Sequence, residues 1–301
     1  HGCRQKSTMI ISYKHRYIFL HCRKTAGSSI SVSLSRDLGP EDLQLSALSE
    51  TRAEGVGFTE RALRDARLQH RKNPRPGRTL ALWGLQGQSA RFRAIKTLVR
   101  ECYGERLNES RPQHAYATSI ARAFPEEWSS FRKFCVVRNP WTKTVSDYFW
   151  RIRGRDNPPS FAEFVRALER RDPMGDIVRV RYHDNWPLYT IDDAVVADEV
   201  VRFENLAPDL TGACERLNIP FDGWLPRVNG KQRPKTGAKA DPLSFYTPEL
   251  RDTVGRLYEK EIAAFGYEFG SAGSKSGGNE EVQVSPANVA DQLSSRSCAP
   301  V

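Results

Sequence analysis

The pattern along this 301-residue chain contains two short apolar runs. Each run is followed by polar or small residues and then by apolar residues at helical spacing. The first run, residues 17–22, is aromatic and β-branched, which favours a buried strand. Beyond Gly27 the residues Ile30, Leu34 and Leu38 recur at helical spacing and stop at a Gly-Pro pair. We therefore expect a strand, a small-residue loop and a helix over residues 28–38.

The second run predicts another strand at residues 131–137, followed directly by a helix that continues to residue 150. Pro140 suits the first turn of that helix, where its missing N–H costs nothing. A third strand is expected at residues 198–203, with further helices at residues 80–107, 115–124, 161–170, 206–217 and 250–265. Strands that alternate with helices predict an α/β fold with a mainly parallel sheet.

Charge separates a basic body from a weakly acidic tail. The chain has 46 Lys and Arg against 36 Asp and Glu, a net charge of +10, while the tail after Gly270 carries two cations against three carboxylates. The positive field favours anionic partners, which include nucleic acid, acidic lipid, acidic glycans and nucleotides. The tail is rich in Ser, Gly, Asn and Ala, so we expect disorder over residues 271–301 and one domain over residues 1–270.

The six cysteines are scattered and form no Cys-x-x-Cys pair, which argues against a zinc site and against a disulfide framework. No metal is expected. No apolar run is long enough to span a bilayer, and the run at residues 17–20 is too short for a signal-peptide core. We expect a cytoplasmic protein with reduced thiols. Because His1 is no natural initiator, the alternative is the lumenal domain of a Golgi enzyme without its anchor.

The loop at residues 23–29, Arg-Lys-Thr-Ala-Gly-Ser-Ser, has the composition of an anion-binding turn. Backbone N–H groups at a helix start favour negative charge, and Gly27 allows an anion to approach the backbone closely. Lys24 adds a positive charge, and hydroxyls are supplied by Thr25, Ser28 and Ser29. The Walker order is absent because the lysine precedes the glycine, which disfavours an ATP or GTP hydrolase. An ordinary helix start capped by serines remains the alternative.

A second candidate element follows the strand at residues 131–137. Arg138 ends that strand, and Ser146 lies about two turns into the next helix. An arginine fork with a nearby hydroxyl suits a second phosphate. Taken singly, Arg138 is typical of a surface arginine and Ser146 of an ordinary helical serine. The pair indicates a phosphate site only in combination with the loop at residues 23–29.

Together these elements resemble the sulfotransferases that use 3′-phosphoadenosine-5′-phosphosulfate (PAPS), in the carbohydrate and heparan-type branch. The similar segments are Phe19-Leu-His-Cys-Arg-Lys-Thr-Ala-Gly-Ser-Ser29, Val137-Arg-Asn-Pro-Trp-Thr-Lys-Thr-Val-Ser-Asp-Tyr148, Arg202-Phe-Glu-Asn-Leu206 and Phe265-Gly-Tyr267. The resemblance spans residues 17–269, but residues 41–107 match no motif. Arg23 stands where family members commonly have proline, which leaves the turn less fixed and lets Arg23 contact the nucleotide or the acceptor.

The resemblance implies a P-loop-like three-layer fold with a central mainly parallel sheet flanked by helices, and residues 41–110 as an insertion on the acceptor side. It also implies in-line sulfuryl transfer from PAPS to a carbohydrate hydroxyl without a metal. Lys24 would donate to the oxygen between phosphate and sulfur. Arg138 and Ser146 would bind the 3′-phosphate of PAPS or of its product PAP. The 5′-phosphosulfate would be bound by Arg23, Lys24, Thr25, Ala26, Gly27, Ser28 and Ser29.

The acceptor hydroxyl needs a general base, and His114 is our choice because a loop histidine with a pKa near neutrality suits that role. It also falls where relatives place a histidine ahead of the second phosphate element. His183 is the second candidate, as base or as part of the acceptor pocket. His21 is less suitable because it lies in the predicted strand, and His15 and His70 lie in strongly basic stretches.

The acceptor is not determined by the pattern. Arg61, Arg64, Arg67 and Arg71 would share one helix face, which predicts either a ridge for an acidic oligosaccharide or a solvated face. The resemblance also implies that the basic segment at residues 231–235 closes over the nucleotide, as a late basic loop does in relatives. The alternatives are sulfation of a lipid or small natural product, a nucleotide-dependent kinase, a nucleic-acid-binding protein, and a PAPS binder without turnover.

Overall fold

A mixed five-stranded sheet forms the centre of the protein. The computed structural model describes residues 9–45, 47–178, 183–227 and 241–270, so the tail at residues 271–301 and the basic segment at residues 231–235 lie outside the described residues. The strand order is β3-β1-β2-β4-β7. The strands are β1 (Ile10–Ser12), β2 (Tyr17–Leu20), β3 (Leu43–Gln44), β4 (Arg132–Val137) and β7 (Glu199–Arg202).

Strand β4 is parallel to both β2 and β7, whereas β1 is antiparallel to β2 and to β3. The prediction of a mainly parallel sheet is therefore right for β2, β4 and β7 and wrong for β1. The reason is local, because β1 returns into β2 through the four-residue turn at residues 13–16, and so short a turn can only join antiparallel strands.

The two middle strands are buried on both faces, as their continuous apolar runs predicted. Tyr17, Phe19 and Phe134 point into one core, against Ile30 and Leu34 of α1 (Gly27–Ser35) and Leu210 of α11 (Leu206–Arg216). Ile18, Leu20 and Cys135 point into the opposite and larger core. Helices thus cover both faces of the sheet, which makes three layers.

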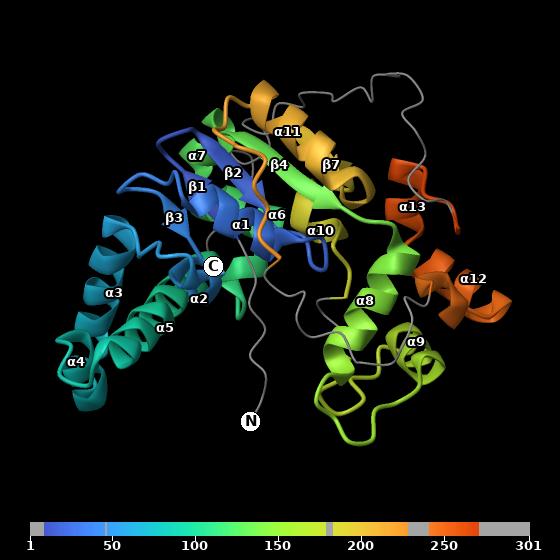
Figure 1. Cartoon of the computed structure of the whole chain (residues 1–301), viewed down its shortest axis with the longest axis horizontal. Helices are drawn as coiled ribbons and strands as arrows, with labels where there is room; N and C mark the ends of the chain where they lie inside the picture. Colours follow the sequence, from blue (N-terminus) through green and yellow to red (C-terminus); the bar gives the residue numbers. More distant parts are fainter. Residues whose placement is uncertain (1–8, 46, 179–182, 228–240, 271–301) are drawn as a thin grey trace, which may run out of the picture.

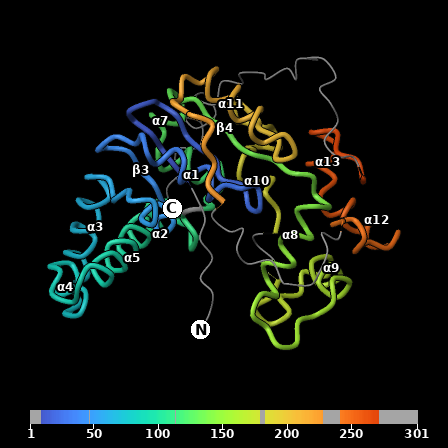
Figure 2. Tube along the Cα trace, in the orientation of Figure 1, coloured from blue at the N-terminus to red at the C-terminus, as the bar shows by residue number. Residues whose placement is uncertain are grey.

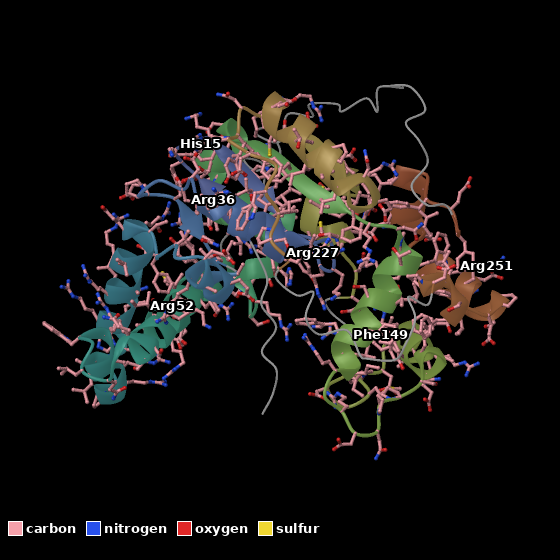
Figure 3. The ribbon with its side chains drawn as sticks, viewed as in Figure 1. His15, Arg36, Arg52, Phe149, Arg227 and Arg251 are labelled. Carbon is pink, nitrogen blue, oxygen red and sulfur yellow. The ribbon has the colours of Figure 1, made fainter. Side chains whose placement is uncertain are left out.

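The larger core is covered by helices from the middle and the end of the chain, and Figure 1 shows them extending to the left and to the right of the strands. They are α5 (Gln88–Leu107), α6 (Ala117–Ala123), α7 (Pro125–Ser130), α8 (Pro140–Ile152), α9 (Phe161–Glu169), α10 (Trp186–Tyr189), α12 (Pro248–Leu257) and α13 (Glu259–Phe265). A small hairpin, β5 (Thr190–Ile191) and β6 (Ala194–Val195), lies among them. Phe149 of α8, labelled in Figure 3, packs edge-on against Phe245.

Two helices predicted as continuous are each divided in two. The segment at residues 80–107 breaks between α4 (Pro76–Leu82) and α5, where Gly84 and Gly87 have φ of 80° and 81°. Such angles lie outside the helical region and favour glycine. The segment at residues 250–265 breaks between α12 and α13 at Tyr258, whose φ and ψ are −123° and 27°.

Residues 41–110, expected as an insertion, are joined to the same core. They supply β3, and Ile95, Leu98 and Val99 of α5 are buried in the larger core. The rest of the segment forms α2 (Leu48–Ala53), α3 (Glu60–Lys72) and α4, and Figure 2 shows α3 and α4 with α5 at one end of the molecule. We call α3, α4 and α5 the helical arm.

The cysteines in the described residues are free thiols, as predicted for Cys22, Cys102, Cys135 and Cys214. Within the same residues, no helix combines the length and the apolar character that a membrane crossing requires.

Candidate functional site

The candidate site lies where β2, β4 and β7 end at a common edge of the sheet. The chain leaves β2 through α1 toward β3 on one side, and it leaves β4 through α8 toward β7 on the other. The point between β2 and β4 is therefore a topological switch point. In open α/β sheets, ligands bind in the crevice outside the carboxyl ends of the strands at such a point.

The loop after β2 turns sharply into α1. Lys24 and Ala26 have φ of 64° and 62°, in the left-handed region. The Ala26 carbonyl accepts hydrogen bonds from Ser29 N (2.9 Å) and Ile30 N (3.2 Å), and the Thr25 hydroxyl donates to the Cys22 carbonyl (2.9 Å). The first N–H groups of a helix have no acceptor within it, and the alanine N-cap supplies no side-chain acceptor. This helix start can therefore donate to an anion.

Arg138, at the end of β4, contacts residues that follow the other two parallel strands. Its Nη1 donates to the Lys24 carbonyl (3.0 Å), and its Nε donates to Thr142 Oγ1 (3.2 Å). The guanidinium carbon lies 4.0 Å from the ring centroid of Phe203, just after β7. The structure thus brings Lys24 and Arg138 together, although they are far apart in the sequence.

Lys24 is surrounded by other cations. Its Nζ lies 4.6 Å from the ring centroid of Trp150, and it is repelled by Arg138, Arg23 and Arg151, with Asp147 as the opposing carboxylate. Burial is the largest cause that lowers the pKa of Lys24, to about 8, and the neighbouring arginines lower it further. A bound anion would relieve this repulsion, so the cluster is built for negative charge.

Ser146, the second partner of the 3′-phosphate in our prediction, is half-buried on α8. It precedes Trp150 by four residues, so the two side chains share one face of the helix. That face is the one toward Lys24, because Trp150 lies beneath the Lys24 ammonium. Ser28 and Ser29 are half-buried in the first turn of α1.

Arg23 does not leave the turn loose, in contrast to our expectation from the missing proline. Its N–H donates to Asn185 Oδ1 (2.9 Å), and its carbonyl accepts from Asn185 Nδ2 (3.1 Å). Asn185 is 1% exposed, and the Arg23 guanidinium faces Asp147 at 3.5 Å. A proline at residue 23 would have no N–H for the first of these bonds. The Asn185 amide therefore fixes the turn.

His114 and His21 form a stacked pair next to the loop, with ring centroids 5.0 Å apart and an interplanar angle of 15°. His114 Nδ1 lies 3.3 Å from the His21 carbonyl, and because a carbonyl only accepts, the proton resides on Nδ1. Its Nε2 is then the basic atom. Burial, followed by His21 and Arg23, holds the pKa of His114 well below its ordinary value, so the expectation of a pKa near neutrality is wrong for this buried ring.

The sequence pattern predicts residues 21 and 22 within the strand, which makes His21 less suitable as a site residue. In the structure β2 ends at Leu20, so His21 belongs to the loop. Its imidazole lies against the Cα of Gly27, so closely that a Cβ there would overlap the ring. Burial, and then Arg23, lowers the pKa of His21 to about 3. The space beside Gly27, which we expected an anion to use, is therefore filled by a neutral imidazole, while Ser28 and Ser29 in the same turn remain partly exposed.

His183 lies farther along this side of the molecule. Its ring packs edge-on against Tyr258 (6.0 Å between centroids), and its carbonyl accepts from the buried Lys143 ammonium (2.9 Å). Lys143 also faces Glu261 at 3.9 Å. This buried contact positions the segment that carries Asn185, and a lysine on an apolar helix face is the signal that could have indicated it.

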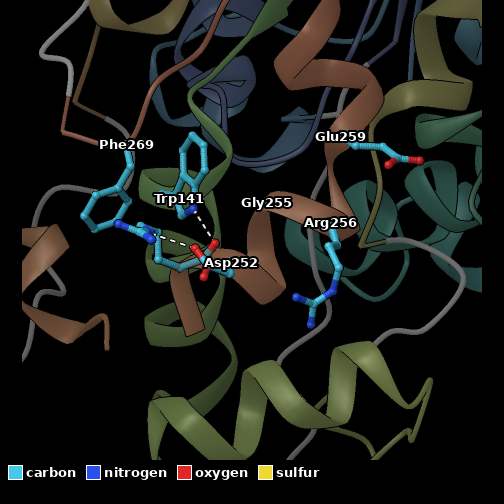
Figure 4. Close-up of a pocket in the computed structure, with 7 residues that line it drawn as sticks. Trp141, Asp252, Gly255, Arg256, Glu259 and Phe269 are labelled. Carbon is cyan, nitrogen blue, oxygen red and sulfur yellow. Dashed lines mark hydrogen bonds and ion pairs between the residues drawn. The ribbon is translucent and has the colours of Figure 1, made fainter. Parts of the chain in front are cut away.

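A separate depression of about 510 Å³ opens beside α12 and the start of α8. Figure 4 shows Trp141 and Phe269 on one side of it and Arg256 on the other, with Trp141 donating to the Arg251 carbonyl (3.0 Å). The residues that line it include none of the loop at residues 23–29. It is therefore not the phosphate site. Among the described residues, no group of three His, Cys, Asp or Glu side chains is placed to hold a metal ion.

Comparison with known proteins gives one informative match. A protein of Archaeoglobus fulgidus, described as an uncharacterized protein, is 32% identical over 91 residues, which are 29% of this chain and 68% of that protein. The chain belongs to the same family as this archaeal protein. No family model matches the chain, and no solved structure matches it. Membership of this archaeal family carries no activity, because the relative's description names none.

The contact between His21 and Gly27 predicts that substitutions at these two residues have coupled effects on the stability of the protein. Gly27→Ala should lower the free energy of unfolding by about 1–3 kcal/mol, because the methyl group forces His21 out of its stack. In a His21→Ala background the same change should cost less than about 0.5 kcal/mol. Urea unfolding of the four proteins measures the coupling. A Gly27→Ala variant as stable as the wild type would contradict this packing.

The burial of the Lys24 charge, with the repulsion from its neighbouring arginines, predicts a gain in stability when that charge is removed. The unfolded chain holds this proton up to pH 10.5 and the folded chain only up to about pH 8. Lys24 therefore lowers stability below pH 8, and this loss is recovered as the pH rises from 8 to 10.5, by at most roughly 3 kcal/mol. The buried tyrosines, whose pKa is raised, give an opposite trend that is the same in all the variants compared. Lys24→Met should be more stable than the wild type at pH 7 and should lack this recovery. Urea unfolding at both ends of this pH range measures the recovery in each protein. The exposed Lys14→Met is the control and should keep the recovery. An equal recovery in Lys24→Met would contradict the prediction.

Proposed function

We propose that this protein is a PAPS-dependent sulfotransferase that transfers a sulfuryl group to a hydroxyl of a carbohydrate. The observation that carries the proposal is the cluster of Lys24, Arg138 and the start of α1 at the switch point of the sheet. The finer fold assignment, a P-loop-like three-layer fold, belongs to the same proposal. It is supported by the strand–loop–helix from β2 to α1 and by the helices on both faces of the sheet.

The donor PAPS has two anionic ends, and the site offers two sets of cationic and hydroxyl groups. The backbone from Thr25 to Ser29 and the Lys24 ammonium suit the 5′-phosphosulfate. Arg138 at the end of β4 and Ser146 on α8 suit the 3′-phosphate. The lowered pKa of Lys24 supports this fit. Burial is its largest cause and repulsion by Arg138 adds to it, and a multiply charged anion between these groups would offset both.

The reaction breaks the bond between sulfur and the bridging oxygen and forms a bond between sulfur and the acceptor oxygen. PAPS supplies the sulfuryl group when bound. The Lys24 ammonium donates a hydrogen bond to the bridging oxygen, where negative charge develops. With a pKa of about 8, Lys24 remains charged at neutral pH and gives up its proton more readily than an ordinary lysine.

His114 is the proposed base, and its Nε2 accepts the proton of the acceptor hydroxyl. The hydrogen bond from its Nδ1 to the His21 carbonyl fixes the tautomer that leaves Nε2 free. Its lowered pKa keeps the imidazole unprotonated across the neutral range. Negative charge bound beside Arg23 would raise this pKa and so strengthen the base.

Two substitutions test the proposed roles in transfer from PAPS to a panel of carbohydrate, lipid and phenolic hydroxyls, with ATP as a control donor for kinase activity. Lys24→Ala should lower kcat by about 10²-fold or more, because it removes a donor to the leaving oxygen. His114→Ala should lower kcat by about 10²- to 10⁴-fold and leave donor affinity nearly unchanged. Matched controls are Lys14→Ala and His70→Ala, which lie away from the loop.

Turnover near the wild-type level in Lys24→Ala would contradict the leaving-group role. An unchanged rate in His114→Ala would transfer the role of base to His183 or His21. Phosphoryl transfer from ATP, without transfer from PAPS, would favour a kinase, and transfer only to lipids or phenols would correct the acceptor class.

A further inference from the structure

The helical arm carries a concentration of positive charge that the phosphate site does not use. Residues 66–100 contain nine Lys and Arg residues and no Asp or Glu. Figure 1 shows α4 at the outer end of the arm, far from the sheet edge where β4 ends. The hydrogen bond between His70 Nε2 and Thr79 Oγ1 (2.9 Å) holds α3 to α4, so the cations of these two helices lie on adjacent elements of the arm.

Part of this charge is neutralised and part is not. Three arginines of the arm have carboxylate partners: Arg61 faces Asp65, Arg64 pairs with Glu41 (2.6 Å), and Arg78 pairs with Glu101 (2.7 Å). Half of the predicted arginine ridge is therefore engaged within the protein. In the part of the chain that the structure describes, four exposed cations of the arm have no carboxylate within ion-pair distance: Arg67, Arg71, Arg75 and Arg93.

The helical arm also exposes large apolar side chains. Trp83 is 79% exposed and Leu85 is 74% exposed, directly after α4. Leu80 and Leu68 are nearly half exposed on α4 and α3. The Leu85 N–H donates to the Leu80 carbonyl (3.0 Å), so the end of the arm is an ordered turn that presents these side chains. Figure 3 shows Arg52 beside the same arm, where its guanidinium lies 4.7 Å from the ring centroid of Phe92.

We propose that the helical arm docks on an anionic membrane surface. Cations alone would suit any polyanion, but an exposed tryptophan with leucines on either side adds apolar area that a membrane interface accepts. Tryptophan favours the boundary between headgroups and acyl chains. Four unpaired cations complement acidic headgroups, each contributing about fivefold in binding near such a surface. The proposal does not depend on sulfuryl transfer, and it would place the catalytic domain at a membrane.

Vesicle flotation tests this docking with the full-length protein. The protein should bind phosphatidylcholine vesicles that contain about 30% phosphatidylserine at least tenfold more strongly than pure phosphatidylcholine vesicles, and raising NaCl from about 0.1 M to 0.5 M should remove the difference. Trp83→Ala combined with Leu85→Ala should lower binding about tenfold or more, and so should Arg71→Glu combined with Arg75→Glu. These residues are exposed, and thermal unfolding checks that each variant remains folded.

Matched controls are the exposed Trp224→Ala, and Arg170→Glu with Arg171→Glu after α9, all of which should bind as the wild type does. Equal binding to neutral and anionic vesicles, or wild-type binding by the arm variants, would overturn the proposal. Two other outcomes would also overturn it: arm-dependent binding of heparin without vesicle binding, and arm-dependent self-association in ultracentrifugation without vesicle binding.

Discussion

The candidate site depends on one hydrogen-bonded contact, the guanidinium of Arg138 against the Lys24 carbonyl. Parallel pairing of β2 with β4 brings the two residues to the same edge of the sheet, and the Phe203 ring after β7 supports the guanidinium from the other side. Because Lys24 has a left-handed backbone, its carbonyl is free to face Arg138 while the next residues enter α1. The loop conformation and the position of the second cationic group are therefore set together.

The charge at this site lowers the stability of the folded protein, because burial disfavours the charged form of Lys24. Lys24 is also repelled by Arg138, Arg23 and Arg151 and attracted by Asp147. Groups whose pKa is shifted by burial and by like charge concentrate at functional sites, since stability is given up there for binding. The proposed nucleotide would restore the balance. In the proposed arm surface too, several cations have no carboxylate within ion-pair distance among the described residues.

The sequence predicted the local parts of this site well. The runs of β2 and β4, the helix after Gly27 and the helix begun by Pro140 were found because each is set by short-range periodicity and by glycine or proline. It did not predict Asn185, which fixes Arg23 from 162 residues away, or the His21 ring on Gly27, which depends on the residue where a strand ends. Long-range contacts of this kind leave no period in the chain. The antiparallel β1 was missed because three residues are too few to show alternation.

The most direct test of the central claim is calorimetric titration with PAP and with AMP, which lacks the 3′-phosphate, on the wild type and on Arg138→Ala. The account predicts that the wild type binds PAP at least about tenfold more tightly than AMP, through a charge-assisted pair with Arg138. Arg138→Ala should lose this preference and retain its affinity for AMP, which reports that the loop at residues 23–29 is intact. Equal binding of PAP and AMP by the wild type, or a preference that survives in Arg138→Ala, would contradict the account.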